Sequence, residues 1–255
     1  MQHFSSSGVD IAYIDVGQGP PIVLIHGFGS NHAVNWQSTG WLTTLAGAGR
    51  RVIAMDVRGH GESAKLYDAA SYRPGLMAED AANLLDHLKI ARADVMGYSM
   101  GGRVAAHLAV VHPERVAALI IGGMGIALVD GICGEKEIVA ALEAPSLDDA
   151  VGEVGRAYRK FAEQTRSDRR ALAACIVGQS ETMSAEQLGR ITAPVLIAVG
   201  EKDKVAGSAR ALAALIRDAE VLVIPNRDHM LATGDKAFKA GVLDFLARKG
   251  LPALP

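Results

Sequence analysis

The sequence predicts an α/β protein with a mostly parallel sheet of about eight strands flanked by helices. Short apolar runs alternate with helical patterns along most of the chain, which is typical of βαβ units. Runs such as Ile22–Ile25 and Val195–Val199 are hydrophobic at every position, as in strands covered by helices on both faces. The alternation stops over residues 123–191, where only helical patterns follow one another.

The expected strands combine β-branched residues with turn-forming residues at their ends. They are Ile11–Val16, Pro21–Ile25, Arg51–Met55, Ala93–Gly97, Val116–Ile121, Pro194–Val199 and Ala219–Ile224. Helices are expected near Trp36–Ala48, Pro74–Leu88, Gly101–His112, Ser208–Ile216 and Asp235–Arg248. No helix separates the first two strands, so we expect them to pair as an antiparallel hairpin at one edge of the sheet.

The helical stretch suggests two parts, a core domain of residues 1–122 and 192–255 and a helical cap of residues 123–191 inserted after the sixth strand. The expected cap helices are Glu135–Leu142, Leu147–Thr165 and Asp168–Gln179. In the middle one, residues at three- and four-residue steps form an apolar face: Val151, Val154, Tyr158 and Phe161. Capping-box patterns at helix starts are Ser146 with Asp149 and Ser184 with Gln187.

Composition excludes several classes of function. The chain has 255 residues with 26 Lys and Arg against 28 Asp and Glu, so no basic excess favours nucleic acid or an anionic membrane as partner. The N-terminus has no signal-peptide pattern and no apolar run approaches the ~20 residues of a membrane span, so we expect a cytoplasmic protein. A monomer or a homodimer is expected. Two cysteines, Cys133 and Cys175, are expected as buried apolar side chains, with a single bridge left open. No metal-binding pattern occurs, and we expect neither a metal nor a cofactor.

The strongest local signal is the segment from Gly97 to Gly101, which reads Gly-Tyr-Ser-Met-Gly. It follows an apolar strand and precedes a helical run, the context of a nucleophile elbow, where a sharp strand-to-helix turn exposes a serine. The glycines fit because the strand and the helix pass close together there. This context predicts Ser99 as the nucleophile.

A serine hydroxyl needs a base to accept its proton. His229 lies in the loop after the last expected strand, where a histidine can reach over the carboxyl ends of the strands. Asp203 directly follows the preceding strand and can orient the His229 ring, ahead of its rivals Glu201 and Asp228.

Acyl transfer also requires donors for the tetrahedral oxyanion. The loop His26-Gly27-Phe28-Gly29 leaves its strand at the carboxyl end, and the backbone N–H groups of Phe28 and Met100 are the expected pair. His26 is expected to brace this loop through hydrogen bonds rather than carry a proton.

Together these segments resemble the α/β-hydrolase superfamily, in its capped form that includes esterases, lactonases, carbon–carbon bond hydrolases and cofactor-free perhydrolases. The resemblance extends from about Val9 to Leu246 and includes the turn from Asp56 to Ser63, which reads Asp-Val-Arg-Gly-His-Gly-Glu-Ser. It implies the order serine, acid, histidine for the catalytic residues. Ser99 stands where haloalkane dehalogenases and epoxide hydrolases of this fold carry an aspartate, so the resemblance excludes their chemistry.

These features predict a carboxylic-ester hydrolase that works through an acyl intermediate on Ser99, with a small-molecule ester or lactone as substrate. An apolar substrate pocket is expected beside the catalytic segments, lined by Phe28, Met100, Met124, Ile126, Val205 and Met230. A lactonase or a carbon–carbon bond hydrolase remains open, and relatives of the latter kind usually carry a cationic cap residue. Three arginines are available for that role but are expected on the solvated face of the cap: Arg156, Arg159 and Arg166. A catalytically weak ligand receptor is the alternative of another class.

Overall fold

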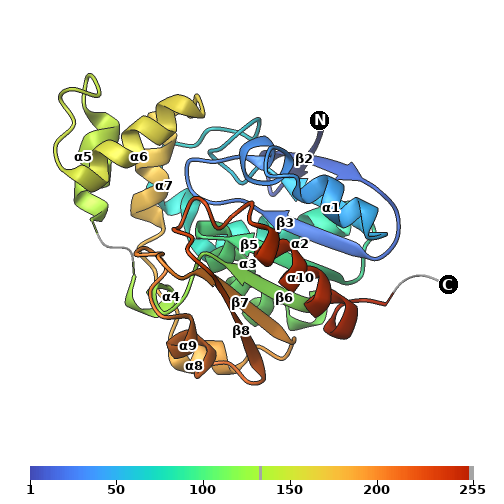
Figure 1. Ribbon diagram of the computed structural model, residues 1–255. Coiled ribbons are helices and arrows are strands. Elements are labelled where there is room, and N and C mark those ends of the chain that lie inside the picture. Colours follow the sequence, from blue (N-terminus) through green and yellow to red (C-terminus); the bar gives the residue numbers. More distant parts are fainter. Residues whose placement is uncertain (132–133, 253–255) are drawn as a thin grey trace.

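The computed structural model describes residues 1–131 and 134–252, and its centre is an eight-stranded sheet (Figure 1). The strands are β1 (Gln2–Ser6), β2 (Val9–Val16), β3 (Pro21–Ile25), β4 (Arg51–Met55), β5 (Ala93–Tyr98), β6 (Val116–Gly122), β7 (Val195–Gly200) and β8 (Ala219–Ile224). They are ordered β1-β2-β4-β3-β5-β6-β7-β8, and all neighbours from β4 to β8 are parallel. The predicted fold class is therefore confirmed.

The expected edge hairpin between β2 and β3 is wrong. β2 pairs with β1 on one side and with β4 on the other, both antiparallel, and β4 separates β2 from β3. The connection after β2 passes close to the loop before β4. A Cβ at Gly17 would lie 2.4 Å from the Arg50 carbonyl oxygen, and one at Gly19 would lie only 2.1 Å from the Gly49 carbonyl oxygen. β3 is buried from Ile22 to Ile25 and lies inside the sheet rather than at its edge. The hairpin at this edge is formed by β1 and β2, and the sequence does not predict it.

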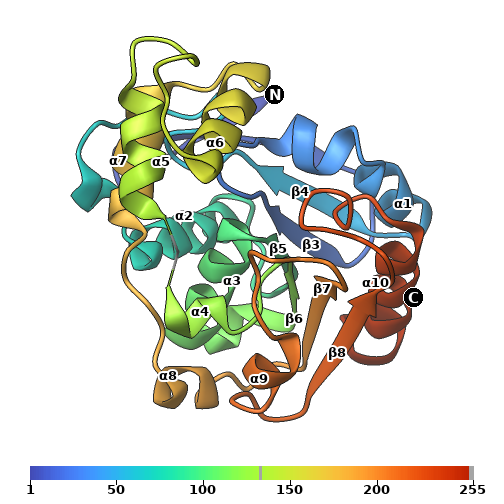
Figure 2. The same cartoon turned by 60° about the vertical axis from the view of Figure 1, so that its left-hand side comes forward.

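Helices cover both faces of the sheet (Figures 1 and 2). Those of the core are α1 (Trp41–Gly47), α2 (Pro74–His87), α3 (Met100–Val111), α9 (Ala209–Ala213) and α10 (Lys236–Lys249), with the short turns η1 (Ala33–Gln37), η2 (Ala69–Tyr72) and η3 (Pro113–Arg115). Alternate residues along the strands enter two separate apolar clusters, for example Val23 with α2 and α3 on one face, and Leu24 with α1 and α10 on the other. These two clusters pack the helices onto the sheet. Because its central strands are parallel, their carboxyl ends lie together at one edge.

Among the described residues between β6 and β7, the helices are α4 (Ala127–Asp130), α5 (Glu135–Glu143), α6 (Glu153–Gln164), α7 (Arg169–Gly178) and α8 (Ala185–Gly189). Of these, α5, α6 and α7 gather beside the sheet around a small apolar cluster of their own, whereas α8 lies near α9 (Figures 1 and 2). The position of the insertion agrees with the sequence, and a cap domain bounded at 123 and 191 stays a prediction. The inference about Cys133 lies outside the described residues.

Helix α6 begins later than its sequence pattern suggests. Ser146 and Asp149 do exchange hydrogen bonds, but Gly152 has a φ of 82° and the helix starts only at Glu153. Half of the expected apolar face is exposed, with Val151 at 80% before the helix and Val154 at 44% in its first turn. The second capping box, Ser184 with Gln187, is confirmed at the start of α8.

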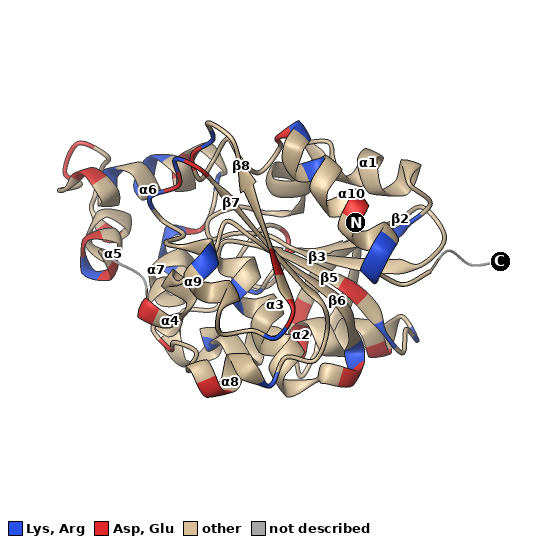
Figure 3. Cartoon of the chain, turned by 60° about the horizontal axis from the view of Figure 1, so that its bottom comes forward, with Lys and Arg blue, Asp and Glu red and all other residues tan. Residues whose placement is uncertain are grey.

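Acidic and basic residues are interspersed over the outer helices and loops, as Figure 3 shows. Within residues 1–131 and 134–252, no helix is both long enough and apolar enough to cross a bilayer.

Candidate active site

Ser99 lies at the apex of a tight turn between β5 and α3. Its backbone has φ 53° and ψ −117°, a conformation that costs about 1–3 kcal/mol for a residue with a side chain and that the surrounding structure must enforce. A Cβ at Gly97 would lie 2.0 Å from the Gly101 carbonyl oxygen, and one at Gly101 would lie 2.0 Å from the Ile25 carbonyl oxygen. Both glycines are required because backbone passes against backbone here.

Three residues from distant parts of the sequence form one series of hydrogen bonds. The Ser99 Oγ lies 3.0 Å from His229 Nε2, and His229 Nδ1 lies 2.8 Å from Asp203 Oδ2. Asp203 follows β7 and His229 follows β8, so neighbouring parallel strands deliver both side chains to the same edge. The Asp203 side chain is fully buried and that of His229 is 17% exposed.

The surroundings of Asp203 favour its ionised form. Burial alone would raise the pKa of Asp203, but the hydrogen bonds from His229 and from the amides of Ala206 and Val205 together lower it. These amides donate to Oδ1 at 2.9 and 2.8 Å. An ionised carboxylate only accepts hydrogen bonds, so Nδ1 of His229 carries the proton and Nε2 can accept one from Ser99. The Tyr98 hydroxyl donates to the His229 carbonyl oxygen at 2.6 Å and holds the loop in place.

The loop after β3 lies beside Ser99. A Cβ at Gly27 would be 3.4 Å from the Ser99 Cβ, and the Gly27 amide donates to Asn35 Oδ1 at 2.9 Å. In the described part of the chain, neither the Phe28 amide nor the Met100 amide donates a hydrogen bond to another residue. Their N–H groups are thus available, and their role as oxyanion donors stays a prediction.

His26 braces this loop. Its Nε2 accepts from the Val57 amide at 3.1 Å, which leaves the proton on Nδ1 to donate to the Gly27 carbonyl oxygen at 2.8 Å. Burial lowers the pKa of His26, although the nearby Asp56 carboxylate opposes that effect. A neutral ring with both nitrogens engaged fits a bracing role.

The buried Asp56 ties the turn after β4 to the turn after β3. It accepts hydrogen bonds from the His32 amide at 2.7 Å, from His32 Nδ1 at 2.9 Å and from the Glu62 amide at 2.9 Å. Burial alone would raise the pKa of Asp56, yet the hydrogen bonds from His32 and from the Glu62 amide hold it at about 2. The Asp56–Ser63 turn, which carries part of the family resemblance, is thus bonded to the turn after β3 and helps to hold it in place.

Four of the six residues expected to line a pocket differ in their surroundings. Met124 is buried in the main core cluster, and Ile126 is partly buried next to Gly207. Val205 and Met230 are 48% and 58% exposed beside the two loops of the site. The structure thus places the first pair within the fold and the second pair at the surface, and a shared apolar pocket stays a prediction.

The arginines of the helical insertion do not all lie on its solvated face. Arg156 is exposed, but Arg159 is only 2% exposed and donates to the carbonyl oxygens of Ala141 at 2.8 Å and Ala144 at 2.7 Å, at the end of α5. The expectation that Arg159 is solvated is wrong, because the last carbonyls of a helix need donors. Arg159 is likewise committed to these bonds and not free to hold a substrate.

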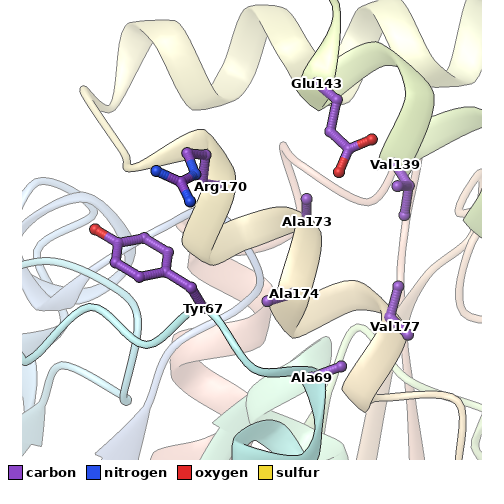
Figure 4. A pocket seen from close by; sticks show the side chains of 8 residues that line it. All are labelled: Tyr67, Ala69, Val139, Glu143, Arg170, Ala173, Ala174 and Val177. Carbon is purple, nitrogen blue, oxygen red and sulfur yellow. The ribbon is translucent and has the colours of Figure 1, made fainter.

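Helix α7 presents different surfaces on its two sides. On one side, Cys175 lies with its Sγ 3.8 Å from the Met100 Sδ, and burial raises the pKa of its thiol. On the other side is a cavity of about 260 Å³ between α7, α5 and the segment before α2 (Figure 4). It is lined by Tyr67, Ala69, Val139, Glu143, Arg170, Ala173, Ala174 and Val177. None of the three hydrogen-bonded site residues lines this cavity.

Sequence reasoning missed the contact between α6 and the loop after β3. The Tyr158 ring lies 5.7 Å from that of Phe28 between centroids, and Phe161 Cδ1 would lie 3.2 Å from a Cβ at Gly29. Helical spacing put Tyr158 and Phe161 on one apolar face, but a local pattern does not say what that face covers.

Comparison with known proteins agrees with the family resemblance of the sequence motifs. Residues 20–168 match the family model described as the alpha/beta hydrolase fold. The chain is similar to a putative carbamate hydrolase RutD of Variovorax paradoxus (strain S110), at 30% identity over 93% of this chain and 95% of that protein. It is also similar to a 2-hydroxymuconate semialdehyde hydrolase of Pseudomonas sp. (strain CF600), at 36% identity over 46% of this chain and 41% of that one. The solved structure of a hydrolase from Pseudomonas aeruginosa PA01 superposes with a TM-score of 0.82 and 26% identity, over 96% of this chain and 98% of that chain.

Proposed function

Because the chain belongs to the alpha/beta hydrolase fold family, we propose that it hydrolyses carboxylic esters through an acyl intermediate on Ser99. The observation that carries this proposal is the unbroken series of hydrogen bonds from Ser99 through His229 to the buried Asp203. In this proposal the three residues are the catalytic triad.

The reaction has two stages. His229 Nε2 accepts the Ser99 proton as Oγ attacks the ester carbonyl carbon, and the backbone N–H groups of Phe28 and Met100 stabilise the oxyanion. Asp203 stabilises the imidazolium, which then returns the proton to the departing alkoxide so that an alcohol leaves. In the second stage His229 takes a proton from water, the hydroxide attacks the acyl carbon, and the proton returns to Ser99 as the carboxylic acid departs.

A second candidate keeps the triad and changes the bond. One relative that matches along nearly its whole length is named a putative carbamate hydrolase, and a carbamate carbonyl accepts the same attack. Lactone and carbon–carbon bond hydrolysis also remain candidates. Initial rates on matched esters, carbamates, enol-lactones and diketones distinguish these classes, and the proposal expects the highest kcat/KM on an ester.

The test of the proposal is the substitution Ser99→Ala with p-nitrophenyl acetate and butyrate as substrates. We expect kcat/KM to fall at least ~10⁴-fold, because loss of a triad serine removes the covalent route. The thermal melt should stay close to that of the wild type, and the exposed Ser5→Ala variant should keep full activity. Undiminished activity of Ser99→Ala would overturn the proposal.

A further inference from the structure

Helix α6 is seated on the loop that carries Phe28. The Phe161 ring packs against Gly29, and the Ser167 hydroxyl, just after the helix, donates to the Gly29 carbonyl oxygen at 3.3 Å. A Cβ at position 29 would lie only 3.2 Å from this ring, and the loop also needs glycine there for its φ of 67°. These contacts hold the helix against the loop.

Tyr158 projects from the same face of α6, three residues before Phe161. Its ring is tilted by 58° against the Phe28 ring, and His60 packs against Phe28 at 5.8 Å between centroids. The aromatic contacts thus fix the phenol beside the residue whose amide is a proposed oxyanion donor.

The Tyr158 hydroxyl has no partner among the residues that the structure describes, although the ring is partly buried. This hydroxyl is not one of the fully buried polar atoms that lack a partner, so it reaches the surface and is free to donate to a bound ligand. Burial, and to a smaller extent the Asp203 carboxylate, raises the pKa of Tyr158, so the phenol stays protonated and able to donate. The oxygens of Asp203 are already engaged by His229, Val205 and Ala206.

We propose that the Tyr158 hydroxyl donates a hydrogen bond to the substrate, and that the enzyme thereby favours esters with a further oxygen acceptor beyond the scissile group. This inference rests on the proposed ester hydrolysis and adds a substrate class to it. The acceptor is an ether, keto or hydroxyl oxygen, in either the acyl or the alcohol part. An ester without such an oxygen leaves the phenol unpaired once substrate excludes water, which weakens its binding.

The test combines the substitution Tyr158→Phe, which removes only the hydroxyl, with two pairs of substrates of equal shape. The acyl pair is p-nitrophenyl methoxyacetate and p-nitrophenyl butyrate, and the alcohol pair is 2-methoxyethyl butyrate and butyl butyrate. We expect the variant to lower kcat/KM about five- to tenfold for the oxygen-containing member of one pair, and less than twofold for its hydrocarbon member. The pair that responds identifies which part of the substrate Tyr158 contacts.

Tyr67→Phe is the matched control, because Tyr67 is an exposed tyrosine that lines the separate cavity of Figure 4. It should change both members of each pair equally. Equal changes in all four esters with Tyr158→Phe would overturn the inference and leave the ester-hydrolase proposal standing. If the wild-type protein hydrolyses none of the four esters, both proposals fail.

Discussion

Residues of one type serve different purposes at this site because their surroundings differ. His26 and His60 are buried, and burial lowers the pKa of both, to about 3 for His60. Their rings contact each other edge to face at 5.2 Å, and His26 is fully engaged in bracing the loop. His229 alone of these three is hydrogen-bonded to both a carboxylate and Ser99. The residues next to each histidine do not predict this difference. The position of His229 in the loop after the last strand does indicate it.

At the residue scale, the first prediction concerns Asp56, whose pKa in the folded state is about 2. A pKa below the unfolded value of ~3.9 means that the carboxylate stabilises the fold fully above pH ~4 and loses this effect as pH falls toward 2. Asp56→Asn should therefore lower the free energy of unfolding by about 2–3 kcal/mol at pH 7, and the deficit should shrink between pH 4 and pH 2. Urea titrations at several pH values measure this, and a deficit independent of pH would contradict it.

At the scale of elements, sequence patterns predict the buried strands more reliably than the exposed edge strand or the start of a helix. β5 and β6 are buried at every residue, and their apolar runs identify them. β1 has only Phe4 and Ser6 buried, so it carries no comparable run and escapes detection. Helix α6 starts later than its sequence pattern predicts, because Gly152, with its positive φ, interrupts a pattern that otherwise continues upstream.

The second prediction concerns the contact of α6 with the end of α5. Arg159→Met should lower the free energy of unfolding by about 1–3 kcal/mol, because the carbonyl oxygens of Ala141 and Ala144 lose a buried donor. The loss is partial because Arg169 also donates to the Ala144 carbonyl oxygen, at 3.0 Å. Denaturant unfolding measures it, with the exposed Lys160→Met as control, expected within about 0.5 kcal/mol of the wild type. An unchanged stability in Arg159→Met would show that the contact contributes nothing.

At the scale of the whole molecule, the topology brings the site together. The order of parallel strands carries Ser99, Asp203 and His229 to one edge, so a sequence with these segments in order predicts both the fold and the series. The seating of α6 over Phe28 could not be predicted in this way, because it depends on how an insertion packs on the core. The sequence accordingly identifies Tyr158 only as part of an apolar face.

The third prediction follows from the separate apolar clusters. The sheet is enclosed by two large clusters, whereas α5, α6 and α7 share a small one, whose buried members in the described part of the chain are Ile138, Leu142, Ala162, Leu172, Ala173 and Ile176. Amide hydrogens of α5 and α6 should therefore exchange through local opening, faster than those of β5 and β6, which require global unfolding. Hydrogen-exchange mass spectrometry measures both regions at once, and equal protection would indicate a single cooperative unit.

The central claim is that His229 activates Ser99 as a nucleophile, and covalent labelling tests it most directly. A fluorophosphonate probe should add one phosphonyl group to the intact protein, and peptide mapping should place it on Ser99. His229→Ala should slow labelling at least ~100-fold, since the hydroxyl then has no base. Absence of an adduct on Ser99, or labelling of His229→Ala at the rate of the wild type, would contradict the account.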